Sequence, residues 1–316
     1  MAEHAITRDM PTHRRWDEAI EPVLRVQPGD VIHVETDDFA GGQITRDSVA
    51  EDLLALDFNQ IYPLAGPIHV EGAEPGDVLA VELLEFQLPE WGWAMIGPNL
   101  GLLPPGELDR PHLKVFDLTE GDTTAFAPGV RIPVEPFCGT TGVPQAGMRD
   151  VPVPPPHAGG GNIDLRHLTA GSTLYLPVGV PGALLSMGDA HAAQGDGEVA
   201  VSGIECQMRT TIRVTVDRSM RLRSPALRRP AGSLTPRVDA GGWFATTGVE
   251  SDLMESARQA VRAMIDHLEQ HRGLSRPDAY MLISLAGDLK ITEVVDAPNW
   301  IVCCFMPDAV FTNEEA

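Results

Sequence analysis

Hydrophobic and polar residues alternate over many short stretches separated by glycine and proline, a pattern typical of strands joined by tight turns. Two stretches, 26–35 and 73–82, share the motif Pro-Gly-Asp-Val-x-x-Val-Glu. Proline presets the first central dihedral of a turn and glycine allows positive φ at the next, so each motif predicts a turn that leads into a strand. The segments 118–126 and 168–178 repeat this arrangement more loosely. We therefore expect a sandwich or barrel of short antiparallel strands.

The last quarter of the chain has a helical pattern. Apolar residues recur at helical spacing through 251–271. Thr247 and Glu250 have the spacing of a capping box, and Gly273 is a candidate C-terminal stop. A second helix is expected at 277–286, capped by Ser275 and followed by a strand at 291–295.

The expected fold is therefore mainly β, with many short antiparallel strands and a smaller C-terminal α+β portion. Residues 1–240 form the body that carries the site, and 241–316 close it as part of one integrated unit. Further strands are predicted at 173–178, 183–187 and 198–216, and an exposed basic loop at 218–237.

Composition narrows the range of partners. The 316 residues carry a formal charge of -22, which repels nucleic acid and anionic membrane surfaces but not a small neutral substrate. The four cysteines have no C-x-x-C spacing, which indicates reduced thiols and a cytoplasmic protein. Residues 1–17 lack the apolar segment of a signal peptide, and no apolar run reaches the about 18 residues of a membrane span.

Candidate chemistry is concentrated in the segment GDAHAAQGDGE at 188–198. Asp189 and His191 stand two residues apart after an apolar stretch, so in a continuing strand both side chains leave one face. A carboxylate and an imidazole placed together can chelate a divalent cation. The same residues also fit a surface hairpin with ordinary Asp-Gly turn chemistry. Residues 144–162 are rich in proline and glycine, as expected of a functional loop or a linker.

Several blocks together resemble the acetamidase/formamidase family, in family order from about residue 7 to residue 308. The segment 188–198, with Glu205 seven residues on, is similar to the family's signature. The segment 66–77, GPIHVEGAEPGD, is similar to a second family block. The other matching blocks are Asp38 with Gly42, Gln43 and Ile44; 136–143; 160–164; and 176–178 followed by Gly182 and Ala183.

The resemblance implies hydrolysis of a short amide, such as formamide or acetamide, to ammonia and the acid. A divalent metal assists such chemistry by polarising the carbonyl and lowering the pKa of bound water. Asp38, Asp189 and His191 are the candidate ligands, and zinc is favoured over calcium because histidine is among them. Glu205 is the candidate general base or acid, while Asp164 and Asn162 are candidates for ligand, orienter or oxyanion donor. The resemblance also implies a homo-oligomer.

Other residues near these motifs have open roles. Gln43, Gln194, Asp196 and Glu198 match family positions, but turn geometry explains them equally well. The remaining candidates are His69, which we interpret as structural; His157, for a ligand or gating role; and Cys138, either a nucleophile or a buried apolar residue. At 142–145 the chain reads GVPQ where relatives commonly read GVAP, a departure that concerns substrate identity.

Two alternatives remain beside this hypothesis. A non-catalytic β-sandwich could bind Ca²⁺ through Asp189, Asp196 and Glu198. A hydrolase of the same family could act on a different C–N substrate. Glu-Lys-Cys and Ser-Ser-Lys amidases are disfavoured, because the only lysines, Lys114 and Lys290, lie in plain strand-like contexts and the chain has no Gly-Ser-rich core. No Gly-x-Ser-x-Gly elbow occurs either.

Overall fold

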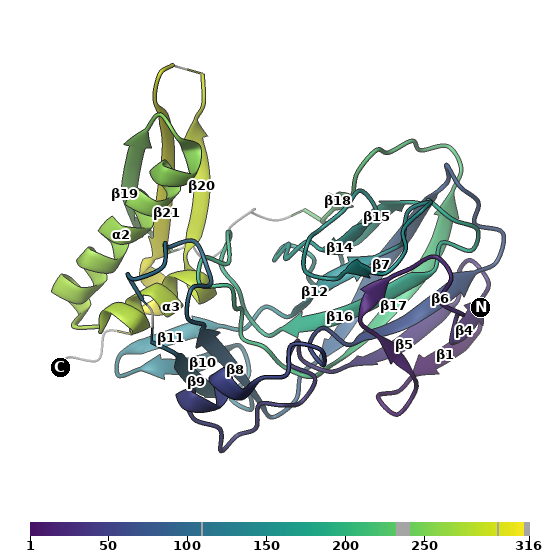
Figure 1. Ribbon diagram of the computed structural model, residues 1–316, viewed down its shortest axis with the longest axis horizontal. Coiled ribbons are helices and arrows are strands. Elements are labelled where there is room, and N and C mark those ends of the chain that lie inside the picture. The colour runs from purple at the N-terminus through teal and green to yellow at the C-terminus, as the bar shows by residue number, and fades with distance from the viewer. Residues whose placement is uncertain (109, 232–240, 296, 313–316) are drawn as a thin grey trace.

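Two six-stranded sheets make up the larger part of the fold in the computed structural model, which describes residues 1–108, 110–231, 241–295 and 297–312 (Figure 1). The strand order of the first sheet is β1 (Glu3–Ile6), β5 (Val31–Thr36), β17 (Met208–Asp217), β7 (Val78–Gln87), β15 (Thr173–Pro177) and β18 (Ala226–Arg228). The order of the second is β14 (Gly160–Asn162), β12 (Phe137–Gly142), β16 (Leu185–His191), β6 (Leu64–Val70) and β2 (Thr12–His13), with β4 (Leu24–Val26) also paired to β6.

The two sheets bury one continuous apolar core. Val34 and Ile212 from the first sheet belong to it together with Ile68 and Leu185 from the second, and all four are fully buried. Buried positions alternate along β5, as expected for a strand with one face in the core. Most strand pairs are antiparallel, although β1–β5 and β4–β6 are parallel. The predicted mainly β fold is confirmed.

The repeated Pro-Gly-Asp motifs form the predicted turns. Gly29 and Gly76 have φ of 98° and 94°, and β5 and β7 begin two residues after them. Positive φ is readily available to glycine, which explains its place in the motif. Asp30 accepts hydrogen bonds from the backbone N–H groups of Ala2 at 2.7 Å and Gln27 at 3.0 Å. It is a structural residue of the turn.

The C-terminal portion is a three-stranded antiparallel sheet with the order β19 (Trp243–Glu250), β21 (Trp300–Pro307) and β20 (Asp288–Glu293). Helix α2 (Leu253–Arg272) lies along this sheet, and α3 (Arg276–Ala286) follows at its base (Figure 1). Both predicted helices and the Ser275 cap are confirmed. The predicted capping box is wrong, because Thr247 and Glu250 belong to β19 and Asp252 is the N-cap.

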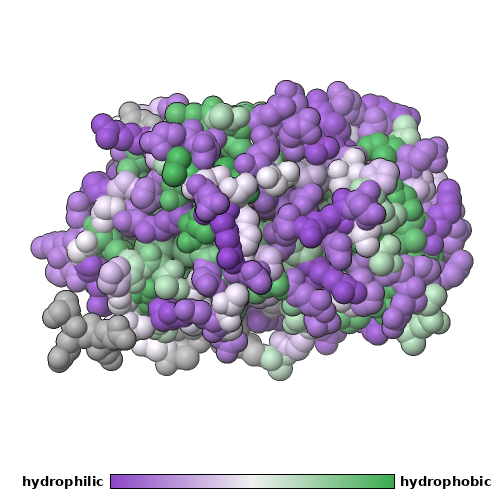
Figure 2. All heavy atoms as spheres, turned by 90° about the horizontal axis from the view of Figure 1, so that it is seen from below, coloured by the Kyte–Doolittle hydropathy of each residue, from purple (hydrophilic) through white to green (hydrophobic). Residues whose placement is uncertain are grey.

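Shorter elements connect these parts. They are β3 (Arg15–Trp16), η1 (Ala50–Ala55), β8 (Trp91–Ile96), β9 (His112–Asp117), β10 (Thr123–Ala127), β11 (Val130–Pro133), β13 (Val151–Pro152) and η2 (Asp308–Val310). Neither helix of the described chain is both long and apolar enough to span a bilayer. Hydrophilic residues dominate the face shown in Figure 2, in keeping with the net charge of -22.

Two sequence-based expectations change, and a third is not tested. The strand predicted at 198–216 begins only at Met208, since Glu198 and Val201 have φ of 42° and 64° and interrupt the extended chain. The predicted basic loop at 218–237 contains β18, and its residues 232–237 lie outside the described residues. The boundary expected after residue 240 also borders that segment, so the division into a body and a closing segment stays a prediction.

Candidate functional site

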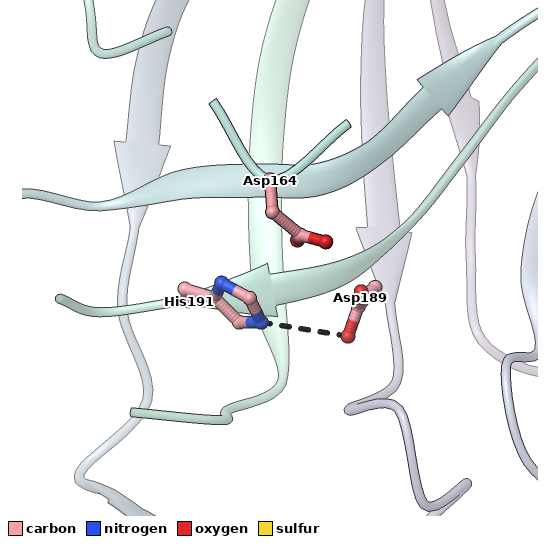
Figure 3. Close-up of side chains that lie close together, drawn as sticks. All are labelled: Asp164, Asp189 and His191. Carbon is pink, nitrogen blue, oxygen red and sulfur yellow. Dashed lines mark ion pairs between the residues drawn. The ribbon is translucent and has the colours of Figure 1, made fainter. Parts of the chain in front are cut away.

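Asp189 and His191 meet at the end of β16, a strand that is buried along its whole length. The Nε2 atom of His191 lies 3.5 Å from Oδ1 of Asp189 (Figure 3). Asp189 has φ of 53°, which is uncommon for a residue other than glycine. The two side chains therefore converge, as expected, although the strand is not regular at this point. Their burial, at 4% and 1% exposure, excludes the surface hairpin as an alternative.

Asp164 approaches the same place from the segment after β14. The backbone N–H groups of Ile163 and Asp164 both donate to the carbonyl oxygen of Gly139, at 3.1 Å each. Possible ligand atoms of Asp164, Asp189 and His191 all lie within 4.8 Å of one another (Figure 3). Oδ1 of Asp164 is buried and forms no hydrogen bond with any described residue. The tertiary structure thus brings three of the predicted site residues together.

Glu205 and Glu198 approach the same nitrogen of the imidazole as Asp189. His191 Nε2 is 3.2 Å from Oε2 of Glu205 and 3.9 Å from Oε1 of Glu198. Oε1 of Glu205 accepts hydrogen bonds from the Gly203 N–H at 3.1 Å and the Ser202 hydroxyl at 3.3 Å. Oε2 is buried and, despite its closeness to Nε2, lies outside hydrogen-bonding geometry. Glu198, open in the sequence analysis, is therefore part of this cluster.

Gln194 sets the orientation of the imidazole. Its Nε2 donates to the carbonyl oxygen of Asp164 at 2.8 Å, so its Oε1, 2.7 Å from His191 Nδ1, is an acceptor. A neutral His191 consequently carries its hydrogen on Nδ1, and the lone pair of Nε2 faces the carboxylates. A histidine held in this way is suited to bind a cation through Nε2.

Burial and mutual charge perturb the acids and the imidazole. Burial raises the pKa of Asp164 and of Glu205 to about 7 each, and the negative charge of Asp189 adds to both shifts. Burial also raises the pKa of Glu198, helped by the charge of Asp164. For His191, burial opposes protonation, but the charges of Glu205 and Asp189 outweigh it and raise the pKa. Four acids thus share a buried space with one base, a set that a divalent cation would neutralise.

Gly139 leaves room for this cluster. A Cβ atom at that position would collide with Oδ1 of Asp164 and would lie 3.1 Å from Cε1 of His191. The neighbouring Thr140 donates its hydroxyl to Oδ1 of Asn162 at 2.5 Å and also lies 3.4 Å from Oδ2 of Asp189. Asn162 is therefore connected to the cluster through Thr140. Thr140 and Gly139 were not among the predicted site residues, although both lie in the matched block 136–143.

Asp38 is buried nearby but lies outside both groups of possible ligand atoms. It accepts hydrogen bonds from the Gly42 N–H at 3.3 Å and from the Trp93 indole at 3.5 Å. Burial raises its pKa to about 6. Trp93 also exchanges backbone hydrogen bonds with Glu205, so Asp38 is connected to the cluster through Trp93. Its predicted role as a ligand stays a prediction.

The other candidates belong to neither group of possible ligand atoms. Asp196 pairs with His167 at 3.4 Å and Lys290 at 3.2 Å. Gln43 hydrogen-bonds the backbone of Ala40 at 2.8 Å and of Asp57. Cys138 is 2% exposed, and burial raises its pKa to about 11, so it suits an apolar packing role better than that of a nucleophile.

A model of the acetamidase/formamidase family matches residues 1–151 and 143–313, which together span nearly the whole chain. The chain belongs to this family. It is therefore an amidohydrolase, and the predicted enzyme class is confirmed. A formamidase from Methylophilus methylotrophus is 28% identical over 96% of this chain and 90% of that protein. An acetamidase from Mycolicibacterium smegmatis is 30% identical over 61% of this chain and 63% of that protein.

Solved structures in the comparison have the same fold. A gamma lactamase from Delftia acidovorans has a TM-score of 0.90 and 25% identity, covering 98% of this chain and 93% of that one. An acetamidase from Bacillus halodurans has a TM-score of 0.67 and 32% identity, covering 97% of each chain. These matches support the family's amide chemistry.

Proposed function

We propose that this family member hydrolyses short linear amides such as formamide and acetamide, using a divalent cation and the buried cluster around His191. The observation that carries the proposal is the convergence of Asp164, Asp189 and Glu205 on one imidazole, whose Nε2 lies 3.2 Å from Glu205 and 3.5 Å from Asp189. The cluster is almost closed to solvent, which favours small substrates.

The residues fit a cation well. Buried carboxylate oxygens without hydrogen-bond partners are costly, and Asp164 Oδ1 and Glu205 Oε2 are two such atoms beside the imidazole. Asp164, Asp189 and His191 would hold the ion, with Asp38 as a predicted further ligand. Histidine favours zinc, because calcium prefers a shell of oxygen ligands. When bound, the ion would polarise the amide carbonyl and lower the pKa of water.

The chain's own groups supply the proton transfers. Glu205 Oε2 takes a proton from the water that attacks the carbonyl carbon and passes it to the amide nitrogen as the C–N bond breaks. The products are the carboxylic acid and ammonia. Ser202 and Gly203 hold the other oxygen of Glu205 in place. Asn162, anchored by Thr140, orients the substrate.

The decisive experiment combines ammonia release from formamide and acetamide with metal analysis of the purified protein. Asp189→Asn should lower both the metal content and turnover. Glu205→Gln should keep the metal and lower kcat by about 100- to 10,000-fold. Equal loss of metal in both variants would make Glu205 a ligand instead. Bound Ca²⁺ with no ammonia release from any amide would favour the non-catalytic binding module.

A cyclic amide is the second candidate substrate. The TM-score of 0.90 to the gamma lactamase exceeds the 0.67 to the acetamidase, although the latter is more similar in sequence. Ring opening of 2-pyrrolidone, measured beside ammonia release from acetamide, distinguishes the two. The cytoplasmic location and the homo-oligomer also stay predictions, and light scattering on the purified protein tests the latter.

A further inference from the structure

Two buried N–H donors near the cluster have no described partner. The Nε1 atom of Trp16 and the Nε2 atom of His157 are both buried and form no hydrogen bond with the residues that the structure describes. Their rings meet edge to face, with centroids 5.0 Å apart. A buried donor without an acceptor is unfavourable by about 1–3 kcal/mol, so a pair of them indicates a missing ligand.

Both atoms are donors. The indole N–H of Trp16 can only donate. The backbone N–H of Gly159 donates to Nδ1 of His157 at 3.1 Å, which places the imidazole hydrogen on Nε2. Burial lowers the pKa of His157 to about 4, so the ring is neutral near pH 7 and keeps this tautomer. A group that satisfies both nitrogens must therefore be an acceptor.

The two donors converge on one glycine. A Cβ atom at Gly161 would lie 3.1 Å from His157 Nε2 and 3.5 Å from Trp16 Nε1. Gly161 has φ of 89°, a conformation that side chains rarely adopt, so the backbone keeps this space clear. Both nitrogens lie on the side of Gly161 from which a side chain would extend, so one acceptor that approaches them there could bind both rings.

This space lies beside the proposed reaction centre. Gly161 directly precedes Asn162 in β14. Three residues of chain span at most about 10 Å, so the Cα atoms of Gly161 and Asp164 lie within about 10 Å of each other. Trp16 packs with Val153 in a small apolar cluster, and the partly buried Tyr62 packs against that apolar cluster. Val153 and Tyr62 line a surface groove of about 400 Å³ whose other lining residues include Arg14 and Arg15. Arg15 pairs with Asp150 at 2.9 Å, and Arg14 donates to the carbonyl oxygen of Gln60 at 3.0 Å.

We propose that Trp16 and His157 form a subsite over Gly161 that binds an oxygen acceptor at the far end of the substrate's acyl chain. The proposal rests on the proposed amide hydrolysis and deepens it. The preferred substrates are then amides whose short acyl chain ends in a carboxylate or carbonyl, such as monoamides of small dicarboxylic acids. The upper bound of about 10 Å between Gly161 and Asp164 allows an acyl chain of a few carbon atoms.

Kinetics on a matched pair of amides tests this subsite. Succinamate carries a terminal carboxylate, and 4-methylpentanamide has the same shape without an acceptor. Trp16→Phe and His157→Phe should each lower kcat/KM for succinamate by about 10- to 100-fold and leave that for 4-methylpentanamide within about twofold. His157→Gln, which retains an N–H donor, should restore part of the loss. Equal effects on both substrates would overturn the proposal.

A binding measurement keeps the test independent of turnover and of variant folding. In the unmodified protein labelled with ¹⁵N-tryptophan, succinate should shift the indole N–H resonance that Trp16→Phe removes. If this resonance does not shift at any succinate concentration up to the solubility limit, the two donors hold only a buried water and the proposal fails. If no amide is hydrolysed yet the resonance moves, the subsite stands and the proposed function fails.

Discussion

Nδ1 of His191 lies 2.7 Å from Oε1 of Gln194, whose amide nitrogen is in turn tied to the backbone of Asp164. One glutamine therefore fixes the tautomer of the imidazole and couples it to the segment that carries a second candidate ligand. A residue that hydrogen-bonds a metal ligand in this way affects metal affinity without contacting the metal.

Gln194→Leu should weaken metal binding by about 10- to 100-fold, because the Nδ1 hydrogen loses its acceptor and the ring its orientation. Competition with a chromophoric chelator measures this affinity. Gln87→Leu, at an exposed position of β7, is the matched control and should leave it unchanged. Unaltered affinity in Gln194→Leu would mean that the imidazole does not bind the ion.

Gly139→Ala should reduce kcat/KM by more than about 100-fold, since the new methyl group would displace the Asp164 carboxylate by an ångström or more. Ammonia release measures the loss, and circular dichroism checks the fold. At Gly241, the nearest atom to an added methyl would be the Ala309 Cβ at 3.3 Å, so Gly241→Ala serves as the control. Full activity in Gly139→Ala would show that Asp164 has no role in the reaction.

Asp278 should make folding stability depend on pH in the acid range. It accepts from His112 at 3.0 Å, pairs with Lys114 at 2.8 Å, and its pKa lies well below its ordinary value, first because of the His112 hydrogen bond. A carboxyl group whose pKa is lower in the folded than in the unfolded protein adds stability at pH values above its unfolded pKa of about 3.9. This contribution is lost as the pH falls below that value.

Urea titrations between pH 7 and the acid limit of folding measure this effect. Asp278→Asn should lower the free energy of unfolding at pH 7 and flatten its fall below about pH 4. Asp47→Asn, at an exposed site, should follow the unmodified protein at every pH. Identical pH profiles for Asp278→Asn and the unmodified protein would contradict the role given to this carboxylate.

Asp252 should cap α2. Its side chain accepts from the backbone N–H of Glu255 at 2.8 Å, so Asp252→Ala should cost about 1 kcal/mol of folding free energy. Thermal unfolding measures the change. Ser251→Ala, one residue earlier, should have little effect. A larger loss from Ser251→Ala than from Asp252→Ala would place the cap one residue earlier than the structure has it.

Local sequence was sufficient for much of this fold. The Pro-Gly-Asp turns, the Ser275 cap and the helical spacing of 251–271 each depend on dihedral preferences and periodicity within a few residues. Where a prediction failed, a longer-range contact decided the outcome. Thr247 and Glu250 have the spacing of a capping box, yet both pair with β21, because sheet formation outweighs a local helix signal.

For the site, the chain by itself determined which segments carry the chemistry: the acid–imidazole pair at 189 and 191, and the family blocks that contain Asp164, Asn162 and Glu205. Only the tertiary structure decided which of these meet. It added Glu198, Gln194 and Thr140 to the cluster and left Asp38 outside both groups of possible ligand atoms, hydrogen-bonded to the Trp93 indole. The reason is physical, because positive φ at Asp164, Asp189 and Glu198 redirects side chains in ways that strand alternation does not predict.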